Sequence, residues 1–267
     1  MQPSGVITIT TDFGHKGPFV GVMKGVILSR FRDARIVDLT HDTPAQWPPE
    51  AGFWVRRSYQ YFPPGTVHLA IVDPGVGTER DILIVEFDHH WFMAPDNGLL
   101  ARMLDSAEKA AVYKLDEDAL ERLDIDPPSN TFHGRDVFAP IAAELAAGNT
   151  TPVSIAKATD TWVPAWVDEP EVSASGVSGS IMTVDAFGNL ISNIDAVLIA
   201  DIASPTVHIA GHDIPLLTTY GNVQPGSLLA LVNSFGVVEV AESEGDASAA
   251  LGVERGAPIR VSASSSA

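Results

Sequence analysis

The chain has 267 residues, of which 45% are hydrophobic, and a formal net charge of −18 at pH 7. This length and apolar content predict one large domain or two ordinary ones with a sizeable core, and they exclude a disordered chain. The 16 Lys and Arg residues, against 34 Asp and Glu residues, argue against a nucleic-acid partner, and the absence of Cys excludes disulfides and thiolate metal sites.

Nothing in the sequence indicates a membrane segment or a secretion signal. No apolar run approaches the roughly 18 residues of a membrane helix. The first residues, MQPSGVITITTDFG, do not join a basic region to an apolar one, as a secretion signal does. We therefore expect no membrane partner and a cytoplasmic location, which also suits a chain without Cys.

Predicted strands and helices alternate along the first part of the chain. The segment VITITT is rich in β-branched residues and predicts a strand at residues 6–11. A helix predicted at residues 18–31 repeats apolar residues at three- and four-residue spacing, which indicates a buried face of Phe19, Val22, Met23, Val26 and Ile27. Further strands are predicted at residues 35–40, 65–72, 81–87 and 91–95, and further helices at residues 48–62, 98–107 and 134–148. The alternation predicts an α/β domain with a central, mostly parallel sheet over residues 1–168.

The pattern changes near residue 168. The polar stretch DEPEVSASGVSG is typical of a linker, and beyond it come short alternating apolar runs without a long helix. We expect a small all-β barrel domain over residues 178–264. The final residues, SASSSA, are predicted to be disordered.

Polar side chains gather where the predicted strands of the first domain end. Ligands of α/β sheets bind beyond the carboxyl ends of the strands, and the residues found there are Asp12, Asp38, His41, Asp73, Arg80, Asp96, Asn97, His133, Arg135 and Asp136. Each taken alone is also explained as a turn or capping residue, so the functional interpretation rests on their convergence. The adjacent His89 and His90 are expected to be exposed and to have no specific role.

Two chemistries fit these residues. In the first, Asp12, His41, Asp73, Asp96 and His133 would hold a metal ion that activates water, although no spacing matches a ligand motif such as HExxH. In the second, Asp73, Arg80 and His133 would hold one water without a metal, and the carboxylate would accept its proton. A phosphate-binding loop and the GxSxG motif of serine hydrolases are both absent from the sequence.

Seven motifs occur in an order that resembles a known family. They are TTDFG with FVGVMKGVI, VDLTHDTPAQ, FPPGTVHLAIVDPGVGTER, FMAPDNGLL, TFHGRDVFAPIAAELA, DAFGNLISNI and LVNSFGVVEVA. Together they resemble the S-adenosyl-L-methionine (SAM) hydroxide adenosyltransferases, also called adenosine-forming SAM hydrolases, over residues 6–262. The resemblance implies an α/β domain and a β-barrel, a homotrimer with active sites at subunit interfaces, and attack of water or hydroxide on the ribose C5′ of SAM, which releases L-methionine and adenosine.

The resemblance also implies roles for individual residues. The family's water-activating Asp–Arg–His set falls on Asp73, Arg80 and His133. The implied substrate contacts are Asp12 at the ribose, Tyr220 on the adenine, Asp185, Asn189, Asn233 and Ser234 near the methionine end, and Gln46 and Trp47 where halogenating relatives carry a tryptophan. No metal and no cofactor are implied, because SAM itself is the substrate.

The chain departs from the family pattern at two neighbouring positions of the first motif. Where the family reads TTDFGxxDxYVG, this chain has Gly17 for the Asp and Phe19 for the Tyr, which predicts weaker substrate binding or altered selectivity.

Two other functions are compatible with the same fold. A SAM-dependent halogenase is disfavoured because an ionised Asp73 would repel halide. A non-catalytic SAM-binding protein is disfavoured because the Asp–Arg–His set is intact.

Overall fold

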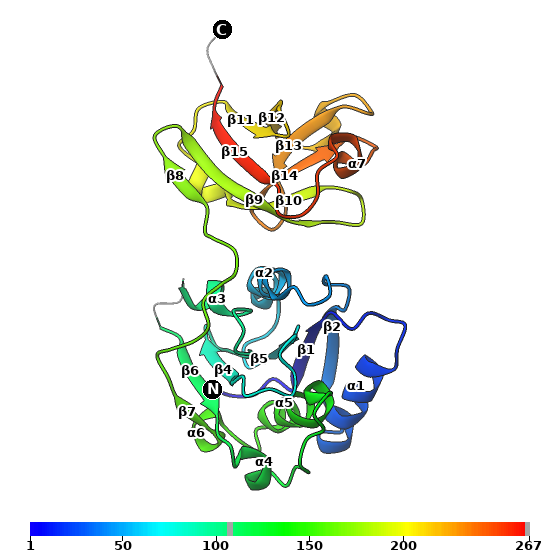
Figure 1. Cartoon of the computed structure of the whole chain (residues 1–267), viewed down its shortest axis with the longest axis vertical. Coiled ribbons are helices and arrows are strands. Elements are labelled where there is room, and N and C mark those ends of the chain that lie inside the picture. The colour runs from blue at the N-terminus through cyan, green and yellow to red at the C-terminus, as the bar shows by residue number, and fades with distance from the viewer. Residues whose placement is uncertain (106–108, 265–267) are drawn as a thin grey trace. The chain divides into compact units, whose positions relative to one another are not determined.

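The computed structural model describes residues 1–105 and 109–264, which divide into two compact units, Met1–Trp166 and Val167–Ala267 (Figure 1). The end of the helix predicted at residues 98–107, and the last three residues of the tail predicted to be disordered, lie outside the described residues. The prediction was wrong for the start of that tail, because Ser262 and Ala263 belong to a strand. No helix among the described residues has the length and apolar character needed to cross a membrane.

The first unit is built on a sheet that contains seven strands within the described residues, in the order β2-β1-β3-β5-β4-β6-β7. The half formed by β2, β1, β3 and β5 is parallel, whereas β4, β6 and β7 add antiparallel pairings. The strands are β1 (Val6–Thr11), β2 (Arg35–Thr40), β3 (Val67–Ile71), β4 (Ile82–Phe87), β5 (His90–Pro95), β6 (Ala111–Leu115) and β7 (Ala156–Ala158). The α/β prediction is confirmed, although the short strands β6 and β7 were not predicted.

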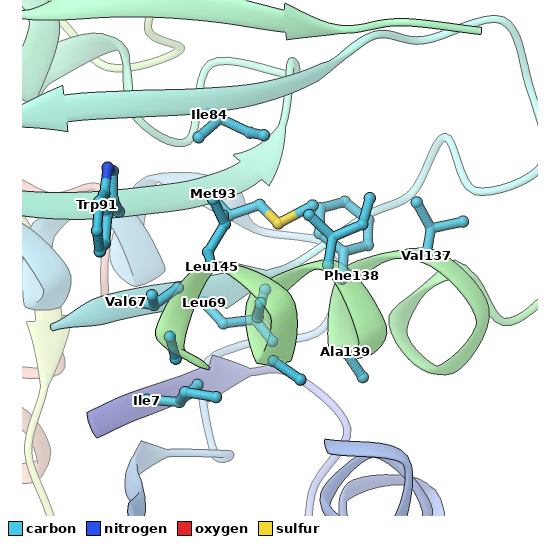
Figure 2. Close-up of a cluster of buried hydrophobic side chains, with 14 of the residues drawn as sticks. Ile7, Val67, Leu69, Ile84, Trp91, Met93, Val137, Phe138, Ala139 and Leu145 are labelled. Carbon is cyan, nitrogen blue, oxygen red and sulfur yellow. The ribbon is translucent and has the colours of Figure 1, made fainter. Parts of the chain in front are cut away.

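Helices cover both faces of this sheet. On one face, α1 packs on α5, and the side chains of α5 and of the turn before it lie against β1, β3 and β5 (Figure 2). On the other face, α2 and α3 pack over alternate residues of β3, β4 and β5. The helices are α1 (Phe19–Arg30), α2 (Pro48–Ser58), α3 (Ala101–Asp105), α4 (Ala119–Arg122), α5 (Ala139–Ala147) and α6 (Pro152–Ile155). Parallel strands buried on both faces explain the continuous apolar runs of the sequence.

The buried face of α1 differs from the predicted one. The buried residues are Val20, Met23 and Ile27, whereas Phe19 is 49% exposed and Val22 is 39% exposed. The three buried residues still follow helical spacing. The predicted helical period was therefore correct, but the observed buried face is rotated about the helix axis from the predicted one. Phe19 leaves the core because its ring packs instead on Phe13 and Phe132.

The second unit is a closed β-barrel, as predicted. Its strands follow the order β10-β14-β13-β12-β11-β15-β9, and a pairing between β10 and β9 closes the ring, while β8 extends it beside β9. The strands are β8 (Glu171–Ser173), β9 (Gly176–Val184), β10 (Leu190–Asp195), β11 (Pro205–Ile209), β12 (His212–Leu217), β13 (Leu228–Val232), β14 (Val237–Glu242) and β15 (Pro258–Ala263), with one short helix, α7 (Ala247–Leu251), in the described part of this unit.

A buried pair of histidines lies at the amino-terminal end of β3 and β5. His68 is 2% exposed and His90 is 4% exposed, so the prediction that His90 is exposed was wrong. The Nδ1 atom of His68 lies 2.8 Å from Thr8 Oγ1, and its Nε2 atom lies 3.1 Å from His90 Nδ1. Burial lowers the pKa of His68 to about 3, with a smaller contribution from His90.

The neutral form of His68 should make the protein sensitive to acid. The unfolded chain protonates this histidine below about pH 6.5, whereas the folded chain resists protonation down to about pH 3, so the free energy of unfolding should fall as the pH falls from 6.5 toward 3, by more than about 1 kcal/mol per pH unit. Urea unfolding of His68→Phe should show a flatter pH dependence over this range. His15→Gln, which changes an exposed histidine, should keep the wild-type slope, and equal slopes for His68→Phe and wild type would contradict the assignment.

Candidate active site

The loop after β3 holds an acidic and a basic side chain in direct contact. Arg80 Nε donates to both carboxylate oxygens of Asp73, at 3.1 and 2.9 Å, and Arg80 Nη2 donates to Asp73 Oδ2 at 2.5 Å. Both side chains are nearly buried, with 5% of Asp73 and 11% of Arg80 exposed. A guanidinium bound in this forked manner fixes the direction of the carboxylate.

A glycine in this loop allows a distant segment to approach. Gly77 has a φ of +77°, and a Cβ atom there would lie 2.1 Å from the carbonyl oxygen of Asn130. Only glycine therefore fits at this position. The approaching segment is held by Asp136, which accepts hydrogen bonds from Ser129 N and Ser129 Oγ. The ion pair with Arg135, and then these hydrogen bonds, lower the pKa of Asp136 to about 2.

His133 completes the contact from this second segment. Arg80 Nη2 lies 3.0 Å from His133 Nδ1, and because a guanidinium can only donate, Nδ1 must accept and the ring hydrogen of the neutral histidine must be on Nε2. Burial, followed by the charge of Arg80, lowers the pKa of His133 below its usual value. The imidazole is therefore neutral at pH 7, and Arg80 bridges it to the carboxylate of Asp73.

These groups line a cavity of about 190 Å³. Asp73 and His133 supply its charged and titratable groups, and the rest of the lining is Phe13, Phe19, Ile71, Val76, Thr131, Phe132 and Gly134. The cavity lies at the carboxyl end of β3, as expected for a parallel sheet. A small, mostly apolar cavity of this kind can separate one water and one reacting carbon from bulk solvent.

Three other predicted residues lie on the loops that follow β1 and β2. Asp12 Oδ2 accepts a hydrogen bond of 2.8 Å from the backbone N–H of Gln46, which holds a positive φ of 60°. The ring of Trp47 packs edge-to-face on Trp166, with 5.8 Å between centroids. Asp12 therefore contacts Gln46 through the backbone of Gln46, and the side chain of Gln46 is exposed.

The residues proposed as metal ligands have other partners. Thr11 Oγ1 lies 2.8 Å from His41 Nδ1, and Asp38 Oδ1 lies 3.1 Å from His41 Nε2. Asp96 accepts from the backbone of Val163 and lies 3.7 Å from Lys114 Nζ. Across residues 1–105 and 109–264, no three Asp, Glu or His side chains are grouped so that they could hold a metal ion.

In the barrel, two predicted residues form a compact turn between β9 and β10. Asp185 accepts from the backbone of Phe187 at 2.8 Å and of Asn189 at 3.0 Å, and from the Asn189 side chain at 3.0 Å. Phe187, at the tip of this turn, is 77% exposed. The carboxylate of Asp185 thus fixes the turn through local hydrogen bonds, as Asp residues commonly do.

A buried carboxylate that the sequence analysis missed supports the other barrel residues. Glu239, 3% exposed, accepts from Tyr220 OH at 2.6 Å and from Asn233 Nδ2 at 3.0 Å. Asn233 Oδ1 in turn accepts from the backbone of the loop that presents the exposed Ser234. Burial raises the pKa of Glu239, and the hydrogen bonds of Tyr220 and Asn233 partly oppose this. A glutamate inside the apolar strand VVEVA was the available signal for it.

Comparisons with known proteins agree over nearly the whole chain. The family models for the N-terminal and C-terminal domains of SAM hydroxide adenosyltransferase match residues 7–155 and 179–260. The chain is 35% identical to an (R)-S-adenosyl-L-methionine hydrolase of Thermus thermophilus, covering 94% of this chain and 97% of that protein, and 35% identical to one of Salinispora tropica, covering 98% and 100%. A fluorinase of Actinopolyspora mzabensis is 24% identical, covering 97% of each chain.

Solved structures show the same likeness. A Thermotoga maritima protein described as an uncharacterized conserved protein superimposes with a TM-score of 0.87 at 32% identity, covering 96% of this chain and 99% of that one. A conserved hypothetical protein of Thermus thermophilus superimposes with a TM-score of 0.76, also at 32% identity, covering 98% and 100%.

The contact of Arg80 with both Asp73 and His133 predicts that removing Arg80 changes the pKa of His133. In Arg80→Gln the cation that lowers the pKa of His133 is lost, while Asp73 and Asp136, whose charges raise it, remain. The pKa of His133 should therefore rise, as followed by NMR titration of its ring proton. Arg30→Gln, which removes a cation paired with Glu144 instead, should leave the titration of His133 unchanged, and an unchanged pKa in Arg80→Gln would contradict the bridge.

Proposed function

Because the chain belongs to the SAM hydroxide adenosyltransferase family, we propose that it hydrolyses S-adenosyl-L-methionine to adenosine and L-methionine. The observation that carries this proposal is the contact of Asp73, Arg80 and His133 beside an apolar cavity. These groups can prepare a water for attack, and the relatives named as hydrolases are 35% identical over nearly the whole chain.

The chemistry needs little beyond alignment and a prepared nucleophile. The oxygen of the water attacks C5′, the bond from C5′ to sulfur breaks, and its electron pair becomes a lone pair on the thioether sulfur of methionine. A sulfonium is already a good leaving group, so the main tasks are to direct the water behind C5′ and to receive its proton. We assign both tasks to Asp73, with Arg80 fixing the carboxylate and the neutral His133 holding the water through its Nε2 hydrogen.

We assign the remaining contacts by the family resemblance. Asp12 would bind the ribose hydroxyls, and Tyr220 would stack on the adenine; the residues assigned near the methionine end or beside the reacting carbon are Gln46, Trp47, Asp185, Asn189, Asn233 and Ser234. Since the Asp–Arg–His set is on the α/β unit and Tyr220 is on the barrel, we further propose a homotrimer whose active sites lie at subunit interfaces. A cytoplasmic location also belongs to this proposal, with support from a sequence that has no Cys.

The names of the relatives suggest which form of the substrate is used. Those 33–35% identical to this chain are named hydrolases of the (R) form of SAM, whereas the fluorinases are only 24–27% identical. We propose that the (R)-sulfonium epimer is the preferred substrate. Removal of an epimer that forms by inversion at sulfur would also give this hydrolysis a purpose that consumption of all SAM would not.

The proposal is tested by the products formed from each epimer. The purified protein should release adenosine and L-methionine from (R)-SAM faster than from (S)-SAM, with EDTA present and without a halogenated nucleoside in chloride, as measured by liquid chromatography. Asp73→Asn should lower kcat by about a hundredfold or more with a much smaller change in KM, because the amide cannot accept the proton.

Each alternative predicts a different result in the same assay. Activity that EDTA abolishes and Zn²⁺ or Mn²⁺ restores would indicate the metal-dependent hydrolase. A 5′-chloro-nucleoside formed in chloride would indicate a halogenase, and tight binding without turnover would indicate a SAM-binding protein. An unchanged rate in Asp73→Asn would refute the role given to this carboxylate.

Glu239 should affect binding rather than the chemical step. Glu239→Gln places an amide N–H₂ beside either Tyr220 or Asn233. Beside Tyr220 the hydroxyl must accept instead of donate, and beside Asn233 two donors face each other. Rotating the Asn233 amide cannot repair this, because its Oδ1 already accepts from Phe235 and Val237. We expect KM to rise several-fold while kcat stays within about twofold. A fall in kcat with KM unchanged would place Glu239 in the chemical step instead.

A further inference from the structure

Three phenylalanine rings gather at the wall of the candidate active-site cavity. The ring centroids of Phe13 and Phe132 are 6.0 Å apart, those of Phe19 and Phe132 are 5.5 Å apart, and those of Phe13 and Phe19 are 6.2 Å apart, all edge-to-face. All three line the same cavity as Asp73 and His133. Phe19 is half exposed and does not take part in the buried face of α1, so packing of the helix does not account for an aromatic ring at this position.

The position of Phe19 depends on Gly17. A Cβ atom on Gly17 would lie 2.7 Å from two ring atoms of Phe19, closer than two carbon atoms approach without a shift. A side chain at position 17 and the present position of the Phe19 ring therefore exclude each other. The two departures from the family pattern, Gly17 and Phe19, are thus coupled, because the loss of a side chain at position 17 leaves room for the Phe19 ring in its present position at the cavity wall.

The geometry of the proposed reaction places a positive charge away from Asp73 and His133, against the rest of the cavity lining. In an in-line displacement the water, C5′ and the departing sulfur are collinear, so a water held by Asp73 and His133 requires the sulfur to lie across the cavity from them. The remaining lining is apolar apart from Thr131. A cation in apolar surroundings is unfavourable unless it is compensated, and the faces of aromatic rings attract cations. One cation already uses this attraction, since the Arg135 guanidinium lies 5.3 Å from the centroid of Phe132.

We propose that Phe13, Phe19 and Phe132 form an aromatic cage that binds the sulfonium cation of the substrate and distinguishes it from an uncharged thioether. This inference rests on the proposed function, because it takes a sulfonium as the ligand. The cage lies beside position 17, where the family pattern has an acidic side chain, and Phe19 is its most exposed member.

The test compares a charged and an uncharged ligand of nearly the same shape. Binding of SAM and of S-adenosylhomocysteine, which lacks the methyl group and the charge, is measured by calorimetry in the slow variant Asp73→Asn. Adding Phe19→Leu keeps apolar area and removes the aromatic face, so it should weaken SAM binding about three- to tenfold and change S-adenosylhomocysteine binding less than twofold. Adding Phe19→Tyr should retain the affinity for SAM, because it keeps the aromatic face.

Two further variants separate the cage from general effects. Gly17→Ala should displace the Phe19 ring and weaken SAM binding selectively, as Phe19→Leu does. Phe53→Leu, at a phenylalanine of α2 that packs edge-to-face on Trp54, should change neither affinity. Equal losses for both ligands, or no loss for either, would overturn the cage. If wild-type turnover of SAM is intact in that case, the proposed hydrolase function survives, whereas a wild-type protein that neither binds nor hydrolyses SAM overturns both.

Discussion

The candidate site depends on one guanidinium that serves two partners. Arg80 neutralises the carboxylate of Asp73 and, with the same Nη2 atom, donates to the imidazole of His133. A buried carboxylate without this partner would be strongly destabilising, and an imidazole without it would be closer to protonation. The bridge therefore fixes the direction of the carboxylate, adds to the lowering of the imidazole pKa, and places the ring hydrogen on Nε2. Without Arg80, the carboxylate would lose its forked contact and the hydrogen of the imidazole would no longer be confined to Nε2, even if Asp73 and His133 stayed in place.

The fold provides this bridge by joining two segments far apart in the sequence. The parallel half of the sheet directs the loop after β3 to the edge where ligands bind, and Gly77 lets that loop contact the backbone of Asn130. On the other side, Asp136 ties Ser129 to the turn that opens α5, and this turn is π-helical, a form common at functional positions. The contact between Arg80 and His133 is thus positioned from both ends by residues that do not line the cavity.

The sequence predicted those parts of the structure that depend on local patterns. Long apolar strands and helices of regular period gave the α/β unit, and short alternating runs gave the barrel. The buried face of α1 was misassigned because the ring of Phe19 packs on Phe13 and Phe132 at the cavity wall and not in the core under α1. His90 was misjudged because it follows an exposed turn residue, and β6 and β7 were missed because each is short and carries a lysine. Glu239 was missed because Tyr220 lies 19 residues away in the sequence and Asn233 lies in the turn between β13 and β14, so that the contacts depend on how these loops fold.

The aromatic cage and the Asp–Arg–His set serve a common electrostatic requirement. Attack by a hydroxide-like nucleophile on a sulfonium brings opposite charges together, so charge diminishes on the way to the transition state. Any group that strongly stabilises the separate charges stabilises the ground state more than the transition state and slows the reaction. A carboxylate beside the sulfonium would act in this way, whereas aromatic faces hold a cation by about 0.5–2 kcal/mol. Likewise, Asp73 does not present a second free negative charge, because Arg80 already pairs with it. With Gly17 and Phe19, the cavity binds the positively charged reactant less strongly than a carboxylate at position 17 would. The positive charge is therefore lost more readily on the way to the transition state.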